Sequence, residues 1–460
     1  MTDAASANAP DHDYHIVARI ERLPISRWHS WMRSVVGTAM FFDGFDGVAI
    51  AYVLPVLIPL WKLSPQDIGG MISIGYAGQV IGSLFFGWLG EKIGRIPSAI
   101  ITITLFSLTS LGCIFVDSYA ALFWLRFVQG IGLGGETPVM HAYINEFAKA
   151  KHRAKFTLVF QLGFAFGILG ASLAAVWVVP SLGWRWMFIL GTIPALMTVP
   201  LRWMIPESPR WLASRGRFVE ADRILTNIEN KIAKQYGGTL PPIPADEPRA
   251  QQAKTRVGDL FKGIYLRRTL TVWGLWFCTY FIGYGMTGWL PSLYRTQFHL
   301  SVQQALNFSF VAQSISICGS IAVAFLVDRT GRKPWFTVAL LLASIPLFVL
   351  WFAPSMSVET VLILICCCLP CISSVSISLG MFTAENYPTH LRALGGGIAG
   401  AWLRVASVIG PYMVGIILPA AGLGAVFVMF GVAAVIGGII CALFATETGG
   451  KVLERVSPVA

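Results

Sequence analysis

The sequence predicts an all-α membrane protein with twelve transmembrane helices, arranged as two six-helix bundles that repeat each other in parallel. Of the 460 residues, 55% are hydrophobic and 12% are charged, whereas a soluble domain carries about 25% charged residues. Long uncharged stretches recur, the longest being 42 residues between Arg404 and Glu447. Similar loop sequences also recur at a spacing of about half the chain. A water-soluble fold is excluded.

A helix that crosses the hydrocarbon core of a bilayer needs about 20 mostly apolar residues. Twelve segments meet this requirement, and we predict one membrane span in each. They are residues 34–60, 69–90, 97–117, 119–146, 155–180, 185–205, 269–295, 303–327, 334–353, 357–384, 391–418 and 422–445. The last two share one uncharged stretch, in which residues 419–422 (Pro-Ala-Ala-Gly) predict a tight turn.

The distribution of Lys and Arg predicts the orientation. If the N-terminus is cytoplasmic, the segments on that side hold 28 of the 34 Lys and Arg residues, as the positive-inside rule requires. Both termini are then cytoplasmic. The formal net charge of +11 therefore reflects membrane topology, and we expect no nucleic-acid partner. The polar first 33 residues do not resemble a cleavable signal peptide.

These spans divide the chain into five parts. We predict an N-terminal tail over 1–33, a first bundle over 34–205, a cytoplasmic linker over 206–268, a second bundle over 269–446 and a C-terminal tail over 447–460. The linker carries twelve Lys or Arg residues, and we expect an amphipathic helix near 218–235 within it.

An internal repeat supports the two-bundle arrangement. Residues 87–97 read Gly-Trp-Leu-Gly-Glu-Lys-Ile-Gly-Arg-Ile-Pro, and residues 324–334 read Ala-Phe-Leu-Val-Asp-Arg-Thr-Gly-Arg-Lys-Pro. The acid, Gly, Arg and Pro recur at an offset of 237 residues. An acid followed by Arg seven residues later ends the fourth and the tenth spans, at an offset of 239. Two similar halves around a midplane site are typical of secondary transporters.

These loops resemble the signature of the major facilitator superfamily, Gly-x-x-x-Asp/Glu-x-x-Gly-Arg, with Ala324 in place of the first Gly in the second copy. The resemblance extends over residues 30–446. It implies a monomer in which the loop charges form a latch that opens as the halves move, since half-exposed ion pairs are worth only ~0–1 kcal/mol. The predicted latch residues are Glu91, Arg95, Glu146, Arg153, Asp328, Arg332, Glu385 and Arg392.

Acidic side chains inside predicted spans suggest proton binding, because a charge in the bilayer costs at least ~2.5–3.5 kcal/mol. Asp43 and Asp46 are three residues apart and share one face of the first span. Two close carboxylates in a low dielectric do not both stay ionised cheaply, so we expect one to hold a proton. Glu136 is a third acid at comparable depth. The alternative is that an Asp only anchors a neighbouring Arg.

Two intramembrane arginines, Arg126 and Arg404, predict an anionic ligand. Arginine stays charged and pairs with carboxylates through two hydrogen bonds, so each is suited to an organic anion or to releasing a buried Asp. Small residues follow the same helix faces, which indicates close helix packing and a cleared cavity face. His141, on the stripe of Arg126, is interpreted as capping a helix end, with a proton relay as the alternative.

Further candidate ligand-binding residues are aromatic or amide side chains in other spans. Interfacial or interhelical packing is the alternative role for each of them. They are Tyr280, Tyr284, Trp402, Gln161 and Gln313. The cysteine cluster at 366–371 lacks His or acidic partners, so we predict packing there and no metal site.

Within the superfamily, the sequence resembles the aromatic acid/proton symporters. The resemblance rests on Asp43-Gly-Phe-Asp46, on Arg126 with Glu146 at the end of the same span, and on Arg392 followed by Arg404. It implies import of an aromatic carboxylate across the bacterial inner membrane by alternating access, driven by protons, with no other cofactor. Arg404 and Arg126 would then hold the carboxylate and the acids would carry the proton. Glu136 is outside this pattern.

Other functions stay open. Residues 207–212, 183–186 and 388–392 also resemble sugar porters, so a sugar or polyol/proton symporter is the alternative. However, 271–288 contains no Gln, and Arg404 is costly opposite a neutral ligand. A drug/proton antiporter is possible because transport direction is not encoded in these residues. A membrane sensor would need a larger signalling domain. No nucleophile–base or metal constellation predicts an enzyme.

Overall fold

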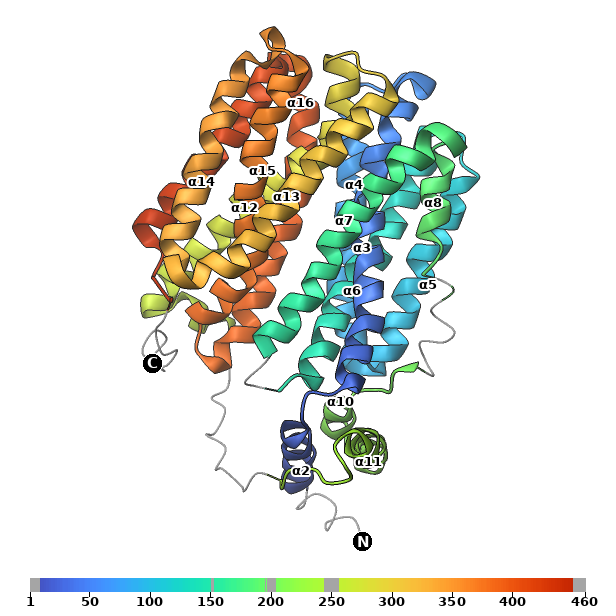
Figure 1. The fold of residues 1–460 in the computed structure, drawn as a ribbon, viewed down its shortest axis with the longest axis vertical. Helices are drawn as coiled ribbons and strands as arrows, with labels where there is room; N and C mark the ends of the chain where they lie inside the picture. The colour runs from blue at the N-terminus through green and yellow to red at the C-terminus, as the bar shows by residue number, and fades with distance from the viewer. Residues whose placement is uncertain (1–8, 150–152, 195, 197–203, 244–255, 450–460) are drawn as a thin grey trace.

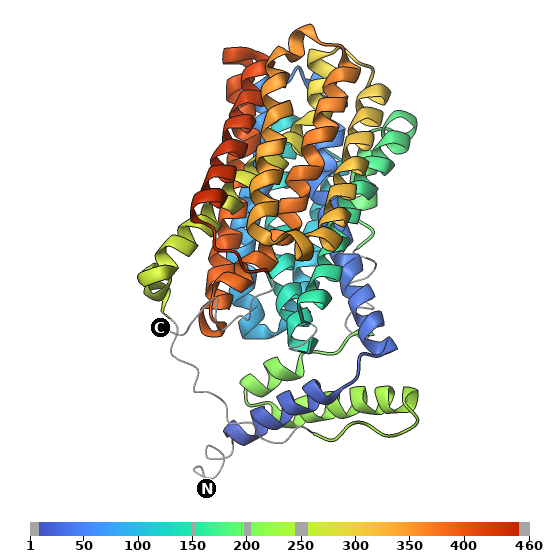
Figure 2. The same cartoon turned by 60° about the vertical axis from the view of Figure 1, so that its left-hand side comes forward.

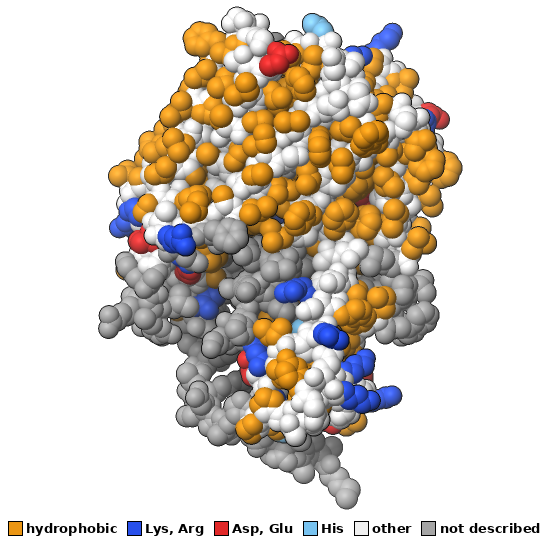
Figure 3. Space-filling view, viewed as in Figure 1, with side chains coloured by type: hydrophobic (Ala, Val, Ile, Leu, Met, Phe, Trp, Pro, Cys, Tyr) orange, Lys and Arg blue, Asp and Glu red, His pale blue; other side chains and the backbone are white. Residues whose placement is uncertain are grey.

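The computed structural model describes residues 9–149, 153–194, 196, 204–243 and 256–449. Long helices run side by side in two bundles, and a small group of helices lies beyond one end, close to the N-terminus (Figure 1). Hydrophobic side chains spread over the visible face of both bundles, while most of its Lys and Arg side chains gather toward the end that carries both termini (Figure 3). This distribution fits a protein whose bundles are surrounded by lipid.

The first bundle contains six helices in chain order. They are α3 (Arg27–Trp61), α4 (Pro65–Ile93), α5 (Arg95–Ile114), α6 (Tyr119–Phe147), α7 (Arg153–Leu182) and α8 (Arg185–Gly191). Local sequence explains several boundaries. For example, the Ser64 hydroxyl accepts a hydrogen bond from the Asp67 N–H at 3.2 Å and caps α4, which begins with a proline. Part of the predicted sixth span lies outside the described residues.

The second bundle repeats this order. Its helices are α12 (Gly263–Gln297), α13 (Val302–Thr330), α14 (Arg332–Val349) with the 3-10 helix η3 (Leu350–Ser355), α15 (Val358–Asn386) and α16 (Thr389–Phe444). Helix α16 contains both the eleventh and twelfth predicted spans. It is interrupted at Gly422, whose φ of 82° lies in the left-handed region that favours glycine. The predicted turn at 419–422 is confirmed.

The fold class predicted from the sequence is confirmed: the chain is an all-α membrane protein with two six-helix bundles. Judged by length and composition alone, eight of the described helices are long and apolar enough to cross a membrane. Helices α6 and α12 are not among the eight, because glycine, tyrosine, tryptophan and charged side chains lower their mean hydropathy.

Glycines bring α4 and α6 into backbone contact. A Cβ added to Gly130 would lie 2.0 Å from the carbonyl oxygen of Gly75, and one added to Gly134 would lie 2.2 Å from that of Gln79. This confirms that small residues on the stripe of Arg126 allow close helix packing. The contact fixes the positions from which α4 and α6 present their polar side chains.

The two bundles meet closely at the end opposite the termini. There α4 and α16 approach through Gly69 and Gly415, where a Cβ added to either would lie 3.2 Å from the other's Cα. The Ser73 hydroxyl donates a hydrogen bond of 2.7 Å to the Val408 carbonyl. In this conformation the halves are therefore closed at that end.

Three helices form a group that we call the cap: α2 (Ala9–Arg22), α10 (Pro209–Ser214) and α11 (Phe218–Gln235). Helices α2 and α11 cross below the first bundle (Figure 2). Helix α11 confirms the amphipathic helix predicted near 218–235, with Leu225 and Ile228 on its buried face. Helix α2 was not predicted, although Ile16 and Ile20 are buried against this cluster.

The helix that holds the first span begins before the predicted span. Helix α3 starts at Arg27, seven residues before residue 34, where the predicted span 34–60 begins. The reason is packing outside the bilayer: Trp28 and Met32 are buried in the same cluster as the cap, which continues the helix past its apolar stretch.

Candidate functional site

Arg404 reaches from α16 into the first bundle. Its guanidinium donates hydrogen bonds to the side-chain oxygen of Gln79 on α4 and, at 3.4 Å, to the hydroxyl of Thr137 on α6. Thr137 in turn donates to the buried carboxylate of Asp43 at 3.1 Å. One hydroxyl thus connects the arginine of one half with an acid of the other. We call these four residues the Arg404 cluster.

The face of α16 beside Arg404 is open. A Cβ added to Gly397 or Gly400 would meet no atom within 4 Å. This agrees with the cleared face predicted from the small residues around Arg404. A ligand that approaches the guanidinium from this side meets no side chain at these two positions.

Arg126 lies in a separate cluster inside the first bundle. It donates to the backbone oxygens of Asp46 at 3.2 Å and Gly47 at 3.4 Å, and to the Gln129 side chain at 2.5 Å. The Ser110 hydroxyl donates to the Asp46 carboxylate at 3.4 Å and accepts from Gln129. Only 2% of Arg126 is exposed, and in this conformation its guanidinium is bonded to the backbone of α3.

The three intramembrane acids therefore have different surroundings. Asp43 belongs to the Arg404 cluster and Asp46 to the Arg126 cluster, although they share one face of α3. Within the described part of the chain, neither carboxyl oxygen of Glu136 has a hydrogen-bond partner, and Glu136 is fully buried. An ionised carboxylate in such a place would carry a large desolvation cost, so the neutral acid is the form that fits.

His141 is not at a helix end. Helix α6 continues to Phe147, so the interpretation of His141 as a capping residue was wrong. Instead it lies within the helix, six residues before its end.

Aromatic rings form a ladder from α12 to α4. Trp276 stacks on Tyr280 with centroids 5.3 Å apart, Tyr280 on Tyr284 at 5.9 Å, and Tyr284 meets Tyr76 edge-on at 4.8 Å. The Tyr280 hydroxyl donates to the Ser376 backbone at 3.2 Å. The predicted pair Tyr280 and Tyr284 is thus part of a larger set that joins the two halves.

The remaining predicted ligand residues lie apart from this ladder. Trp402 packs against Trp273, with centroids 5.5 Å apart, and against Phe277 at 6.1 Å. Gln161 on α7 and Gln313 on α13 are half-buried, and neither hydrogen-bonds the Arg404 cluster in the described residues.

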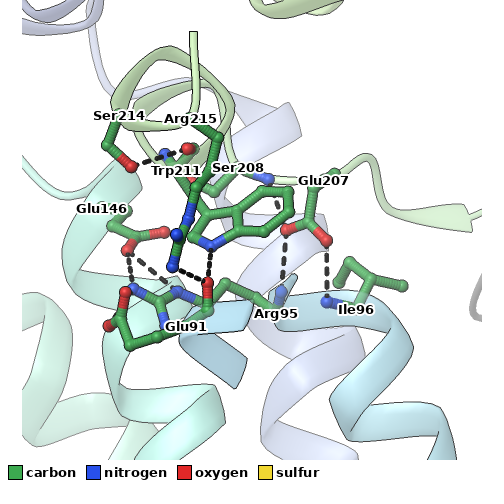
Figure 4. Close-up of polar contacts among 9 residues, drawn as sticks. All are labelled: Glu91, Arg95, Ile96, Glu146, Glu207, Ser208, Trp211, Ser214 and Arg215. Atoms are coloured by element: carbon green, nitrogen blue, oxygen red, sulfur yellow. Dashed lines mark hydrogen bonds and ion pairs between the residues drawn. The ribbon is translucent and has the colours of Figure 1, made fainter. Parts of the chain in front are cut away.

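Three of the four latch residues predicted in the first half, Glu91, Arg95 and Glu146, meet in one cluster (Figure 4). Arg95, at the start of α5, pairs with Glu91 of α4 and with Glu146 of α6, both at 2.8 Å. One arginine thus connects three helices. The cap adds to this contact, since the Trp211 indole N–H donates to the Glu91 carbonyl at 2.9 Å and Arg215 donates to the same oxygen.

The second half repeats the arrangement in part. Arg332, at the start of α14, pairs with Glu385 of α15 at 3.0 Å. Arg392 is half-buried, and its Nε has no hydrogen-bond partner among the described residues. The side chains of Arg153 and Asp328 lie outside the described residues.

Sequence reasoning missed an acid in each half that caps the helix carrying the latch arginine. Glu207 accepts the backbone N–H of Arg95 at 3.1 Å and of Ile96 at 3.2 Å. Glu447 accepts those of Arg332 at 3.0 Å and Lys333 at 2.9 Å. A carboxylate at a helix N-terminus is favoured by the unpaired N–H groups and the helix dipole. An acid just after the sixth and the twelfth spans was the available signal.

The two capping acids differ in electrostatics. Burial raises the pKa of Glu207, although N–H groups of Ser208, Ile96 and Arg95 favour its charged form. Burial acts on Glu447 in the same direction, but backbone hydrogen bonds led by Gly449 outweigh it and lower the pKa. Glu207, the capping acid of the first half, is therefore more easily protonated than Glu447, the capping acid of the second half.

Gln79, Tyr76, Ser110 and Gln129 were also missed as site residues. All four are uncharged polar side chains inside spans, and the sequence search concentrated on charges. A polar residue at the centre of an apolar run was the signal for Gln79, which lies ten residues inside the predicted span 69–90.

Comparisons with known proteins give a family match and several transporters of similar sequence. The sequence profile of the family described as "Sugar (and other) transporter" matches residues 33–460. The niacin transporter NiaP of Acinetobacter baylyi is 31% identical over 96% of this chain and 99% of its own. The gallate transporter of Pseudomonas putida is 29% identical over 82% of each chain. The 4-hydroxybenzoate transporter PcaK of Acinetobacter baylyi is 27% identical over 84% of this chain and 86% of its own.

Solved structures agree on the fold. The crystal structure of a D-xylose–proton symporter superposes with a TM-score of 0.73 at 20% sequence identity, covering 91% of this chain and 98% of that one. At this identity the likeness concerns the fold alone. Together with the family match, it identifies the protein as a multi-pass membrane transporter and not an enzyme. The chain belongs to the family described as "Sugar (and other) transporter".

Proposed function

We propose that the protein imports an aromatic carboxylate together with protons, by alternating access between its two halves. The observation that carries this proposal is the Arg404 cluster. A permanently charged guanidinium is carried by a helix that has open space at Gly397 and Gly400, and it is joined through Thr137 to the acid Asp43. An anion site and a proton site then share one hydroxyl.

The chemistry of the site supports a carboxylate with a ring. Arginine binds a carboxylate through two charge-assisted hydrogen bonds, and the ladder that ends at Tyr76 and Tyr284 offers aromatic faces nearby. The named relatives point the same way, since niacin, gallate and 4-hydroxybenzoate are all aromatic rings that carry a carboxyl group.

Proton coupling is assigned to the intramembrane acids. Asp43 exchanges its proton next to the substrate site, because Thr137 lies between it and Arg404. Asp46 and Glu136 lie deeper in the first bundle and store or relay the proton. Uptake of an anion with more than one proton carries positive charge inward, so the membrane potential also drives it.

The halves exchange access by breaking one set of contacts and forming another. The close contact of Gly69 with Gly415 opens to admit the ligand, and the two halves then close against each other at the opposite end, which carries the Arg95 and Arg332 latches. We place both termini in the cytoplasm and the protein in the bacterial inner membrane, acting as a monomer. The Lys and Arg bias of the loops supports this orientation.

The test is uptake into proteoliposomes that contain the purified full-length protein. Labelled nicotinate and 4-hydroxybenzoate are offered with and without an inside-alkaline pH gradient. Nicotinamide, which replaces the carboxylate by a neutral amide, is the matched ligand control, and xylose tests the sugar alternative.

We expect gradient-driven accumulation of at least one acid and none of nicotinamide. Loss of this uptake in Arg404→Ala would support the assigned anion site. Accumulation of xylose in place of the acids would contradict the proposal and favour sugar transport. Acid efflux that needs an opposite gradient would reverse the assigned direction.

A further inference from the structure

Gln79 is held in place on α4 from two sides. Its backbone lies against α6, where a Cβ added to Gly134 would come within 2.4 Å of the Gln79 Cα. Its side-chain oxygen accepts a hydrogen bond from Arg404 of the other half. The residue is 5% exposed. Its amide oxygen therefore occupies a donor of the same guanidinium that we assign to the substrate carboxylate.

We propose that Gln79 is an internal competitor for Arg404, whose amide oxygen takes the place of one carboxylate oxygen and is displaced when an anionic ligand binds. This inference rests on the proposed function, because it requires that Arg404 binds the carboxylate. It assigns a role in selecting the ligand to Gln79, a residue that does not itself bind the ligand.

The charge of the competing acceptor decides which ligands displace it. A carboxylate forms charge-assisted hydrogen bonds about twice as strong as those of a neutral acceptor such as an amide. The planar guanidinium also fits both oxygens of a carboxylate at once. A sugar hydroxyl is neutral and gains nothing over the amide of Gln79. Gln79 therefore excludes neutral ligands from Arg404.

The same hydrogen bond has a second effect on the empty carrier. A guanidinium left without a partner between the two halves would be strongly destabilising. Gln79 supplies an acceptor from α4 to a charge on α16, in addition to the Thr137 hydroxyl, so two donors of Arg404 have partners when the site is empty. When the ligand replaces Gln79, its carboxylate takes over this partnership.

The experiment measures the dissociation constant of nicotinate and of 4-hydroxybenzoate with the purified full-length protein at pH 7.5. Gln79→Glu keeps the shape and adds a negative charge, so we expect Kd to rise at least tenfold. Gln79→Met keeps the length but removes the acceptor, so we expect Kd to fall at least twofold. Gln66→Glu, at an exposed position of α4, adds the same charge elsewhere and should bind like the parent.

Parental affinity in Gln79→Glu would overturn the inference. A parental or higher Kd in Gln79→Met would also overturn it, since Gln79 would then not compete with the ligand. If Gln79→Glu fails to fold, Gln79→Met decides alone. Arg404→Ala separates the two proposals: if it binds the acids like the parent, the proposed function fails, whereas weakened binding leaves Gln79 as the question.

Discussion

Glu207 and Glu447 occupy matching positions in the two halves, 240 residues apart, and each carboxylate caps the helix that begins with a latch arginine. Each also lies against a glycine with positive φ, Gly94 at 112° and Gly331 at 87°. A Cβ on Gly94 would come within 2.4 Å of the Glu207 carboxylate, so glycine is required there for space and for backbone conformation. The repeat thus includes the helix cap as well as the latch.

Replacing Glu207 by Ala should slow transport more than it weakens binding. The change removes the cap of α5, worth about 0.5–2 kcal/mol, and loosens Arg95 where the halves must close. We expect an uptake rate reduced about tenfold with Kd within threefold of the parent. Glu359→Ala, at an exposed first turn of α15, is the control. Equal losses of rate and affinity would contradict a role in gating.

The Thr137 hydroxyl should be required for coupling. Thr137→Val keeps the shape but removes the group between Arg404 and Asp43, so a proton on the acid no longer affects the guanidinium through it. We expect gradient-driven accumulation to fall at least tenfold while exchange of labelled for unlabelled acid persists. Thr137→Ser restores the hydroxyl and should restore accumulation. Full accumulation in Thr137→Val would show that coupling follows another route.

The glycine contact between α4 and α16 should be required for closure. Gly69→Val places side-chain atoms where a single added Cβ already lies 3.0 Å from the Pro411 carbonyl oxygen, and that oxygen is backbone. The halves then cannot close at that end, and we expect uptake below a tenth of the parental rate. Gly380→Val is the control, because a Cβ there meets nothing within 4 Å. Parental uptake in Gly69→Val would refute the closure assignment.

Glu136→Gln should leave the fold intact. Both carboxyl oxygens are buried without partners among the described residues, so the group fits as a neutral acid and the amide has nearly its shape. We expect the free energy of unfolding to change by less than about 1 kcal/mol. Thermal unfolding in detergent measures this. A large loss would show that the native site holds an ionised and paired carboxylate.

The cap should loosen when Glu229 is removed or protonated. Burial would raise the pKa of Glu229, but hydrogen bonds from Arg19 and Arg22 outweigh it and hold the pKa below its ordinary value of 4.5. A carboxylate with a lowered pKa stabilises the fold fully above its ordinary value, and the stabilisation is lost as pH falls through the lowered pKa. Docking of α2 on α11 should therefore weaken below about pH 4.5.

Spin labels on α2 and α11 can measure this docking. The exposed positions His15 and Asn230 carry the labels as cysteines, with exposed Cys318 and Cys367 changed to serine. We expect Glu229→Gln to broaden the distance distribution at pH 7, with a cost of about 1–3 kcal/mol for a pair between exposed and buried. Glu220→Gln, which removes an exposed pair on α11, should leave it narrow. A broad parental distribution would contradict docking.

The sequence was sufficient to predict the membrane fold, because uncharged runs and the loop repeat depend only on composition and spacing. It also located the turn at Gly422 and the helix 218–235, where one strong local pattern determines the structure. Helix α2 was not predictable in the same way. Its apolar residues Ile16 and Ile20 are few, and only the partner helix α11 makes their burial favourable.

The site was predictable to the extent that it depends on charge. Asp43, Asp46, Arg126 and Arg404 stand out because each is costly in lipid. Their grouping was not predictable, since two acids on one face of α3 belong to different clusters once α6 and α16 are in place. Gln79 carries no charge, so only the three-dimensional contact with Arg404 distinguishes it from other amides.

The cap has a practical consequence for imaging. Transporters with two similar halves and little mass outside the detergent belt are hard to align in electron micrographs, because a half-turn about the pseudo-twofold axis looks nearly the same. Here α2 and α11 project from beneath one half only, and they are fastened by Arg19, Glu229 and a buried apolar seam. A binding protein raised against this projection would be held rigidly beside one half. The two halves could then be told apart in the images.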